Sequence, residues 1–251
     1  MIAIVLPKAD DRILGALTFQ KSKKFKVYLV TGEADEYPSL KVRHGSWSQV
    51  TERYVCILEP GTVPDPHFVC RINWTLWRHP KFDVYHMNVS GQKAFPRKAS
   101  ARKVFQLAVW KGVTAPLSSF VFRADALRKN AVFKADGTLD VLPTVFSCCK
   151  ERPWRNIWLG QLEWRGPEAA QTEATVRERL KLFRWTEEFF GDDDYPLTVG
   201  DQLKLFADEV ARLPVSEDEK WEIMSSFVVS QGTIRRARAS SALKSALKVQ
   251  E

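Results

Sequence analysis

The sequence predicts an α/β domain followed by a helical extension. Ile2–Leu6 is a short apolar run stopped by a proline, as expected of a first strand. Tyr54–Leu58 has the unbroken apolar character of a strand buried on both faces, as in a parallel sheet. Beyond Gly166 the composition becomes helical. We therefore expect residues 1–166 to form a sheet domain and residues 167–251 a helical extension.

The other elements of the sheet domain follow from the spacing of their apolar residues. Helical spacing, with apolar residues three and four apart, predicts helices, whereas alternating or unbroken apolar runs predict strands. The expected helices are Asp10–Gln20 and Phe68–Trp77, and the further strands are Phe25–Val30, Leu40–Val42 and the alternating segment Phe82–Val89.

Two capping-box patterns mark helix starts in the extension, since a hydroxyl residue is followed three positions later by an acid. The pairs are Thr198 with Asp201 and Ser216 with Glu219. The helix after Ser216 is expected to place Trp221, Met224 and Val228 on one face. Further helices are expected over residues 175–190 and 233–249.

The composition indicates a folded protein in a reducing compartment. The 251 residues are 45% hydrophobic, which is enough for a sizeable core. No apolar run approaches the roughly 20 residues that span a bilayer, and the first residues lack the features of a signal peptide. The cysteines have no metal-type spacing, so we expect buried free thiols and a cytoplasmic protein. They are Cys56, Cys70, Cys148 and Cys149.

Positive charge is concentrated at the end of the chain. Of the formal net charge of +8, half lies in residues 231–251, where five Lys and Arg face one Glu. Such a segment favours a polyanionic neighbour, either the inner face of an anionic membrane or a nucleic acid. A terminal helix that is simply solvated is the alternative.

The stretch after Tyr54–Leu58 has the features of a ligand-binding site. Glu59 ends the strand, and the prolines and glycine that follow prevent its continuation. An acid at the carboxyl end of a buried strand points into the crevice where open α/β sheets bind ligands. We therefore place the functional centre at this acidic turn, residues 59–69.

The acidic turn resembles that of family 2 glycosyltransferases, which have the GT-A fold, a Rossmann-like mixed sheet flanked by helices. Glu59 falls at the first acid of the family's Asp-x-Asp motif, Gly61 at the second acid, Pro66 at a proline and Phe68 at the aromatic that opens a helix. The resemblance implies a divalent metal, Mn²⁺ or Mg²⁺, held by Glu59 against the diphosphate of a nucleotide-sugar. Because Gly61 carries no carboxylate, the metal motif is degenerate.

The same resemblance implies further donor-binding residues at the ends of the first two strands and on the acceptor side. Pro7 ends the first strand, and Glu33 and Asp35 follow the second, where the family contacts the nucleotide base or ribose. Residues 112–127 resemble the acceptor-side segment, with a short strand ending in Arg123 and a helix after it.

Asp140 falls at the family's catalytic base, at the start of a helix, although Leu139 replaces the Glu that precedes it there. A carboxylate at a helix start is also a good cap, which is the structural alternative. Residues 156–166 resemble the closing hairpin of the family.

The resemblance implies an inverting glycosyltransferase that moves a sugar from a nucleotide-sugar, most simply a UDP-sugar, to a glycan or lipid-linked acceptor in cell-surface polysaccharide synthesis. A binding protein of the same fold without catalysis is the first alternative, because of Gly61 and Leu139. A nucleic-acid-binding protein that uses the basic tail and the loop 93–103 is the second.

Overall fold

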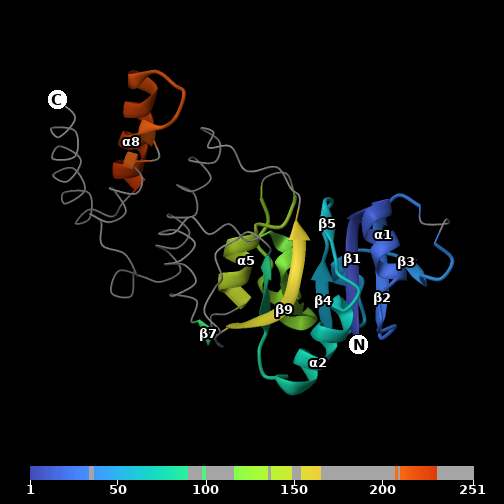
Figure 1. Ribbon diagram of the computed structural model, residues 1–251. Coiled ribbons are helices and arrows are strands. Elements are labelled where there is room, and N and C mark those ends of the chain that lie inside the picture. The colour runs from blue at the N-terminus through green and yellow to red at the C-terminus, as the bar shows by residue number, and fades with distance from the viewer. Residues whose placement is uncertain are drawn as a thin grey trace. The chain divides into compact units, whose positions relative to one another are not determined.

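The structure is a computed structural model that describes residues 1–33, 37–89, 98–99, 116–134, 137–148, 154–164, 207–208 and 210–230 (Figure 1). The chain forms two compact units, Met1–Gly166 and Pro167–Glu251. Asp35, most of the loop 93–103, and the segments 175–190 and 233–249 lie outside the described residues.

The first unit is built on a mixed sheet. Its described strands are β1 Ile2–Lys8, β2 Phe25–Thr31, β3 Val42–His44, β4 Tyr54–Ile57, β5 Thr62–Val63, β6 Val84–Val89, β7 Lys98–Ala99, β8 Phe120–Arg123 and β9 Trp154–Trp164. They pair in the order β3-β2-β1-β4-β8-β6-β9-β5, with β7 beside β9. The strands β1 to β4 are mutually parallel, and β8 runs antiparallel to both of its neighbours.

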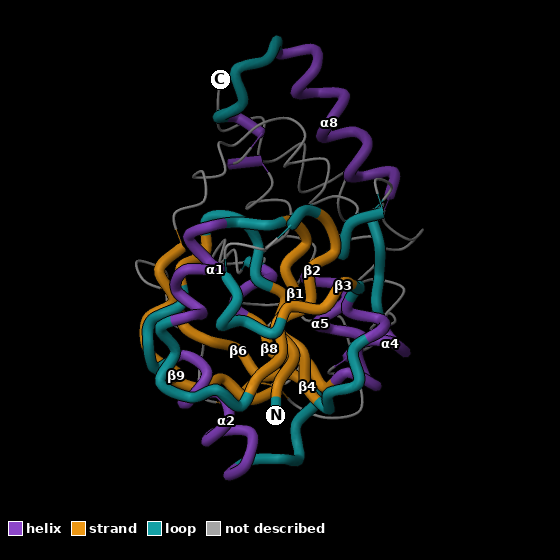
Figure 2. The backbone as a smooth tube through the Cα atoms, turned by 90° about the vertical axis from the view of Figure 1, so that its right-hand side faces the viewer, coloured by secondary structure: helices purple, strands orange, loops and turns teal. Residues whose placement is uncertain are grey.

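Helices cover both faces of this sheet. Those of the first unit are α1 Asp11–Thr18, α2 Phe68–Arg78, α4 Ala124–Asn130 and α5 Val141–Cys148, with 3₁₀ turns at Trp47–Gln49 and Leu117–Ser119. Figure 2 shows α1 and α2 on one side of the strands and α4 and α5 on the other. One continuous apolar cluster joins α1 and α2 to alternate residues of β1 and β4, which fits the two-residue period of a strand.

Helix α1 shows how the local sequence fixes an element. Asp10 precedes it with an extended backbone, and its Oδ1 accepts hydrogen bonds from the N–H groups of Arg12 (2.9 Å) and Ile13 (3.2 Å). These bonds satisfy amides that have no partner within the helix. Ile13, Leu14 and Leu17 are fully buried, so the predicted helix and its apolar side are confirmed.

The predicted α/β class is confirmed, and so is the prediction that the strand before Glu59 is buried on both faces. All four residues of β4 are buried. The third strand lies two residues later than predicted, at β3, because Leu40 forms a turn with Tyr37 (N to O, 2.9 Å). The apolar residues of 82–89 alternate with polar ones, but the strand has no exposed face there. Residues 84 to 87 of β6 are all buried, so both faces of the strand are covered.

Two predictions in the first unit are wrong. In the described part of the segment 156–166 there is no hairpin, because residues 156–164 belong to the single strand β9, which pairs with β6, β7 and β5. Cys70 is exposed rather than buried, since it lies on the outward side of α2. Cys56 and Cys148 are buried free thiols, as predicted, and burial raises the pKa of the Cys148 thiol to about 12.

The second unit contains the described helix α8, Glu217–Ser230. Its predicted capping box is confirmed, because the Ser216 N–H donates to Glu219 Oε2 (3.0 Å) and the Glu219 N–H donates to Ser216 Oγ (3.3 Å). Met224 is buried as predicted, but Trp221 is 48% exposed, so these two residues do not share a buried face. In the part of the chain that is described, no helix combines the length and the hydropathy needed to cross a bilayer.

Candidate functional site

The carboxyl ends of three parallel strands meet at one edge of the sheet, which we call the donor edge. Lys8 at the end of β1 is in register with Thr31 at the end of β2, and Val5 is in register with Ile57. Glu59, two residues past Ile57, therefore comes beside Pro7. The Pro7 carbonyl accepts a hydrogen bond from Thr31 Oγ1 (2.9 Å), which ties the two strand ends together.

The turn after β2 is built on a glycine. Gly32 has a φ of +95°, in the region that favours glycine, and a Cβ built on it would lie 2.8 Å from the Ala9 Cβ. The Ala9 N–H donates to the Thr31 carbonyl (3.0 Å), so the chain just past β1 is bonded to the last residue of β2. Glu33 follows directly and is exposed, two residues past the end of β2.

Glu59 is held in place by Ser118, from the 3₁₀ turn that precedes β8. The Glu59 N–H donates to Ser118 Oγ (2.7 Å), and the Ser118 N–H donates to Glu59 Oε2 (3.4 Å). The Thr62 hydroxyl also donates to Ser118 Oγ (2.9 Å). Ser118 and Thr62 are fully buried, so the bond between their hydroxyls forms away from water, whereas the bonds to the half-buried Glu59 are partly exposed. Sequence reasoning missed Ser118, which has no motif of its own.

Asp10 is a second carboxylate that reaches the acidic turn. While its Oδ1 caps α1, its Oδ2 accepts a hydrogen bond from the Gly61 N–H (3.4 Å). Gly61 has a φ of +86°, a conformation that side chains other than hydrogen rarely adopt. The residue at the second acid position is therefore a glycine for a backbone reason. The sequence predicted Asp10 only as the start of a helix. Its position directly before α1, the helix that follows β1, was the feature from which a contact with the acidic turn could have been expected.

For a divalent metal the turn offers the carboxylate of Glu59, since that of Asp10 is bonded to the backbone of α1 and of Gly61. Among the described residues, no group of three or more His, Cys, Asp and Glu side chains is arranged to enclose a metal. Mg²⁺ and Mn²⁺ are nevertheless often bound by one or two carboxylates together with substrate phosphates. Glu59 has the required chemistry, and Ser118 holds its carboxylate at the donor edge.

Asp140 lies immediately before α5. Its N–H donates to the Val132 carbonyl (2.8 Å), and its carbonyl accepts from the Thr144 N–H (3.0 Å). Thr144 Oγ1 in turn accepts from the Val132 N–H (3.0 Å). These bonds join the backbone of Val132 to Asp140 and to the first turn of α5. The opposite end of α5 lies beside the start of α4, where Cys148 Sγ donates to the Ala126 carbonyl (3.6 Å).

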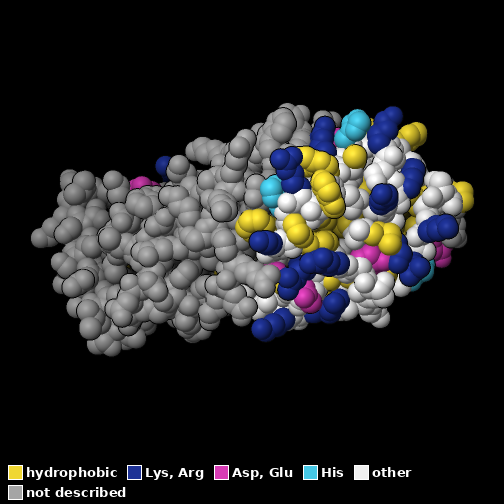
Figure 3. Space-filling model, turned by 90° about the horizontal axis from the view of Figure 1, so that it is seen from below, with side chains coloured by type: hydrophobic (Ala, Val, Ile, Leu, Met, Phe, Trp, Pro, Cys, Tyr) yellow, Lys and Arg dark blue, Asp and Glu magenta, His cyan; other side chains and the backbone are white. Residues whose placement is uncertain are grey.

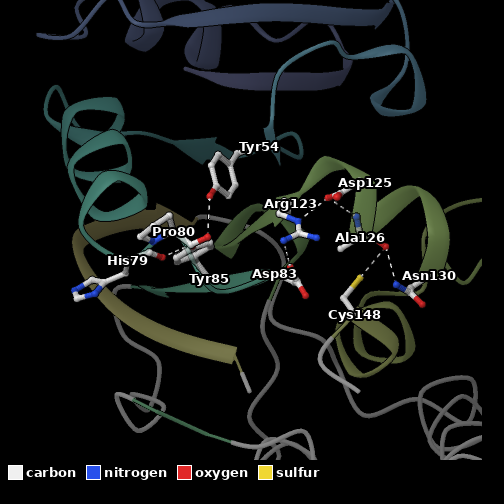
Figure 4. Close-up of polar contacts among 10 residues, drawn as sticks. All are labelled: Tyr54, His79, Pro80, Asp83, Tyr85, Arg123, Asp125, Ala126, Asn130 and Cys148. Atoms are coloured by element: carbon white, nitrogen blue, oxygen red, sulfur yellow. Dashed lines mark hydrogen bonds and ion pairs between the residues drawn. The ribbon is translucent and has the colours of Figure 1, made fainter. Parts of the chain in front are cut away.

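The structure does not bring Arg123 to the donor edge. Because β8 is antiparallel to β4, Arg123 is in register with Tyr54, at the end of β4 remote from Glu59. Figure 4 shows its guanidinium between two acids, with Nη1 at 3.1 Å from Asp83 Oδ1 and Nε at 2.7 Å from Asp125 Oδ1. The hydrogen bond from Arg123 lowers the pKa of the Asp125 carboxyl. We therefore leave Arg123 out of the donor site.

An open hollow of about 290 Å³ adjoins Arg123 at this opposite edge. Its charged groups have structural partners, because Arg123 pairs with Asp83 and Asp125 and the Arg128 Nη1 donates to the Val50 carbonyl (3.3 Å). The lining residues are Thr51, Glu52, Arg53, Arg123, Ala124, Asp125 and Arg128.

Comparison with solved structures identifies the architecture. The structure of TarS from S. aureus superposes with a TM-score of 0.64 at 11% sequence identity, over 96% of this chain and 52% of TarS. The chain has the GT-A fold. This confirms the architecture that the acidic turn implied.

Two further structures show the same GT-A fold. TarS 1–349 from S. aureus gives a TM-score of 0.61 at 11% identity, over 96% of this chain and 87% of the other. The mannosyltransferase PcManGT from Pyrobaculum calidifontis, in complex with GDP-Man and Mn²⁺, gives 0.53 at 12% identity, over 98% and 85%. The chain spans about half the length of full TarS. Neither a family model nor a curated protein sequence matches the chain.

Proposed function

We propose that the chain is a glycosyltransferase that moves a sugar from a nucleotide-sugar to a glycan or lipid-linked acceptor with inversion. The observation that carries the proposal is the meeting of Pro7, Glu33 and Glu59 at one edge of a GT-A sheet. Ligands of open α/β sheets bind outside the carboxyl ends of the strands, which is where these residues lie.

In this proposal the donor lies across the ends of β1, β2 and β4. Glu33 contacts the base or ribose, and so does Asp35, which lies outside the described residues. Glu59 holds the divalent metal, which when bound stabilises the negative charge that develops on the leaving diphosphate. Gly61 lets the backbone of the turn approach the diphosphate closely.

Asp140 is the proposed general base. Its carboxylate accepts the proton of the acceptor hydroxyl while that oxygen forms a bond to the anomeric carbon. The bond between the anomeric carbon and the diphosphate oxygen breaks on the opposite side, which inverts the configuration. A positioned base of this kind accelerates a reaction by roughly 10²–10⁴-fold.

The experiment that tests the proposal is calorimetric titration of the full chain with UDP-glucose, UDP-N-acetylglucosamine and GDP-mannose, each with and without Mn²⁺. We expect one of the UDP-sugars to bind, and more tightly with Mn²⁺. GDP-mannose belongs in the series because PcManGT carries it. If none of them binds at millimolar concentration, the proposal fails.

A binding protein that has lost catalysis is the alternative, favoured by Gly61 and by Leu139. Leu139 takes part in a β-bridge with Phe133, so the residue before Asp140 serves the backbone of the loop. The two functions are separated by incubating the protein with a radiolabelled donor that it binds, Mn²⁺ and candidate acceptors. If the protein binds the donor but neither transfers its sugar nor slowly hydrolyses it, the result favours the binding protein.

For the acceptor, we propose a growing cell-surface polysaccharide or its lipid-linked precursor at the inner face of the membrane. The basic segment 231–251 supports this, because five cations against one acid would be attracted to anionic headgroups. Replacing Arg235, Arg236 and Arg238 with Glu should then weaken transfer to a lipid-linked acceptor but leave transfer to a short soluble acceptor unchanged.

A further inference from the structure

Three aromatic side chains on the surface of the first unit contribute little to its core. Phe19, directly after α1, is 75% exposed, and on α2 Trp74 is 53% and Trp77 is 77% exposed. The opposite side of α2 packs normally, with Ile72 and Leu76 buried. Single exposed apolar residues are common, but a group of large aromatic ones marks a surface that meets something else.

These aromatic residues belong to two segments that adjoin each other. The Gln20 side chain donates to the Asp65 carbonyl (2.7 Å) and accepts from the Val69 N–H (3.0 Å) at the start of α2. Farther along α2, Asn73 Nδ2 donates to the Lys24 carbonyl (3.0 Å). The loop 19–24 is therefore fastened along α2. We call residues 19–24 and 74–81 together the aromatic–basic face.

The aromatic–basic face carries only positive charge. The loop contributes Lys21, Lys23 and Lys24, and the end of α2 contributes Arg78 and Lys81, all of them exposed, while neither segment contains Asp or Glu. The Arg78 guanidinium lies over the Trp74 ring, 5.1 Å from its centroid. Figure 3 looks from below at the end of the molecule where α2 lies, and shows hydrophobic side chains interspersed with Lys and Arg.

Tryptophan beside lysine and arginine on the outside of a helix is the chemistry of a bilayer interface. Tryptophan rings settle at the level of the headgroups, and basic residues are attracted to anionic lipids. A strand of nucleic acid would instead need a groove that follows its backbone. The open hollow described above lies elsewhere, around Arg53, Arg123 and Arg128.

We propose that the aromatic–basic face docks the first unit onto the surface of an anionic lipid bilayer, with Trp74 and Trp77 inserted among the headgroups. This site is separate from the basic segment 231–251 and goes beyond the proposed sugar transfer, on which it does not depend. Helix α2 runs away from the acidic turn, and its far end lies at the start of β4, where the Tyr54 hydroxyl donates to the Pro80 carbonyl (3.4 Å).

The test is co-sedimentation of the full chain with vesicles of phosphatidylglycerol and phosphatidylcholine, and with vesicles of phosphatidylcholine alone. We expect binding to the anionic vesicles that weakens as salt is added. Lys23→Glu with Lys24→Glu should lower the partition constant by about 25-fold or more, because each cation near such a surface contributes roughly fivefold. Trp74→Ala with Trp77→Ala should lower it by about tenfold or more.

Matched controls use residues of the same kind elsewhere. Trp221→Ala removes a half-exposed tryptophan from α8. Lys41→Glu with Arg43→Glu reverses two exposed charges, one just before β3 and one within it. Both controls should bind vesicles like the wild type. Circular dichroism should show that the replaced tryptophans, being exposed, leave the fold intact.

Three outcomes would overturn the proposal. The first is a wild-type chain that does not sediment with anionic vesicles. The second is a Trp74 and Trp77 double variant that binds as well as the wild type, while reversal of Arg235, Arg236 and Arg238 removes binding. The third is a mixed-sequence DNA duplex that displaces the protein from vesicles at equal phosphate concentration and no longer binds the Lys23 and Lys24 variant.

Discussion

The two carboxylates proposed to act on substrate, Glu59 and Asp140, are held in different ways. Ser118 holds the side chain of Glu59, whereas the bonds to Val132 and Thr144 hold the backbone of Asp140. Substituting one of them should therefore leave the surroundings of the other unchanged. This makes the donor step and the proton transfer separable by experiment.

Asp140→Asn tests the general base. Asparagine keeps the shape and caps a helix about as well as aspartate, but it cannot accept the proton. We expect transfer to fall by roughly 10²–10⁴-fold, with donor affinity and melting temperature nearly unchanged. Transfer is measured with radiolabelled donor, and binding by calorimetry. Full turnover in this variant would show that Asp140 is only a helix cap.

Glu59→Gln tests the metal ligand. The amide keeps a hydrogen-bond acceptor for the Ser118 N–H but lacks the negative charge that attracts a divalent cation. We expect donor affinity in the presence of Mn²⁺ to fall by about tenfold or more, and donor affinity without metal to change little. Calorimetric titration with and without Mn²⁺ measures both. Equal losses under the two conditions would mean that Glu59 does not bind the metal.

Glu52 links stability to pH. It is 6% exposed, forms an ion pair with Lys26, and accepts a hydrogen bond from the Tyr28 hydroxyl (2.8 Å). Burial alone would raise the pKa of this carboxyl, but the bonds from Lys26 and Tyr28 outweigh it and the pKa lies below its ordinary value. The unfolded chain therefore takes up this proton first as the pH falls. The stabilisation is complete above the unfolded pKa of about 4.3 and is lost as the pH falls through the folded pKa.

Glu52→Gln should accordingly lower the free energy of unfolding by about 1–3 kcal/mol at pH 7, because it leaves Lys26 without its partner. The difference from the wild type should shrink as the pH falls below about 4. Urea unfolding at several pH values measures it. Asp218→Asn, at an exposed position of α8, is the control. A difference that is independent of pH would contradict the assignment.

Among the elements, the turn after β2 requires a glycine at residue 32, whereas helix α1 does not require one at residue 15. Gly32→Ala should lower the free energy of unfolding by about 1–2 kcal/mol, because φ is +95° and the new Cβ would meet Ala9. Donor binding should weaken too, since the turn carries Glu33. Gly15→Ala, inside α1 with no atom within 4 Å of the new Cβ, should instead stabilise by about 0.5–1 kcal/mol. Thermal unfolding of the two variants measures the contrast, and shifts of the same sign would contradict it.

Elements whose determinants are local could be predicted from the sequence. The Asp10 cap with the stripe of Ile13, Leu14 and Leu17 defines α1 within a few residues. The Ser216–Glu219 capping box does the same for α8. The strand before Glu59 could be predicted because an apolar run that stops at Glu-Pro-Gly has few other interpretations.

Features that depend on distant partners could not be predicted in this way. Ser118 is recognisable only through Glu59, 59 residues away. Arg123 was predicted to bind the donor because the direction of its strand is invisible in the local sequence. The hairpin over 156–166 was wrong for the same reason, since the partners of β9 come from β5, β6 and β7. The roles of Pro7, Glu33, Glu59 and Asp140 stay predictions.

At the scale of the whole molecule, the first unit contains the residues that the proposed function assigns to donor binding. Its apolar cluster is drawn from β1, β2, β4, α1, α2 and neighbouring strands, all before residue 122. The donor edge is likewise built from residues of Met1–Gly166. We expect a chain ending at residue 166 to unfold cooperatively and to bind the donor within about threefold of the full chain, measured by calorimetry. A fragment with no cooperative transition would show that the second unit is needed for folding.

The bond between Glu59 and Ser118 also implies an order of events during synthesis, in which the proposed donor site is completed only after Ser118 has been made. The cap of α1 closes over three residues and can form as soon as they leave the ribosome, but the acidic turn must wait until 59 further residues have been made. Contacts so far apart in sequence form slowly, since a long loop has to close first. A nascent chain halted before Ser118 should therefore contain α1 and yet be unable to retain a nucleotide-sugar. Donor capture would then report that β8 has joined the sheet.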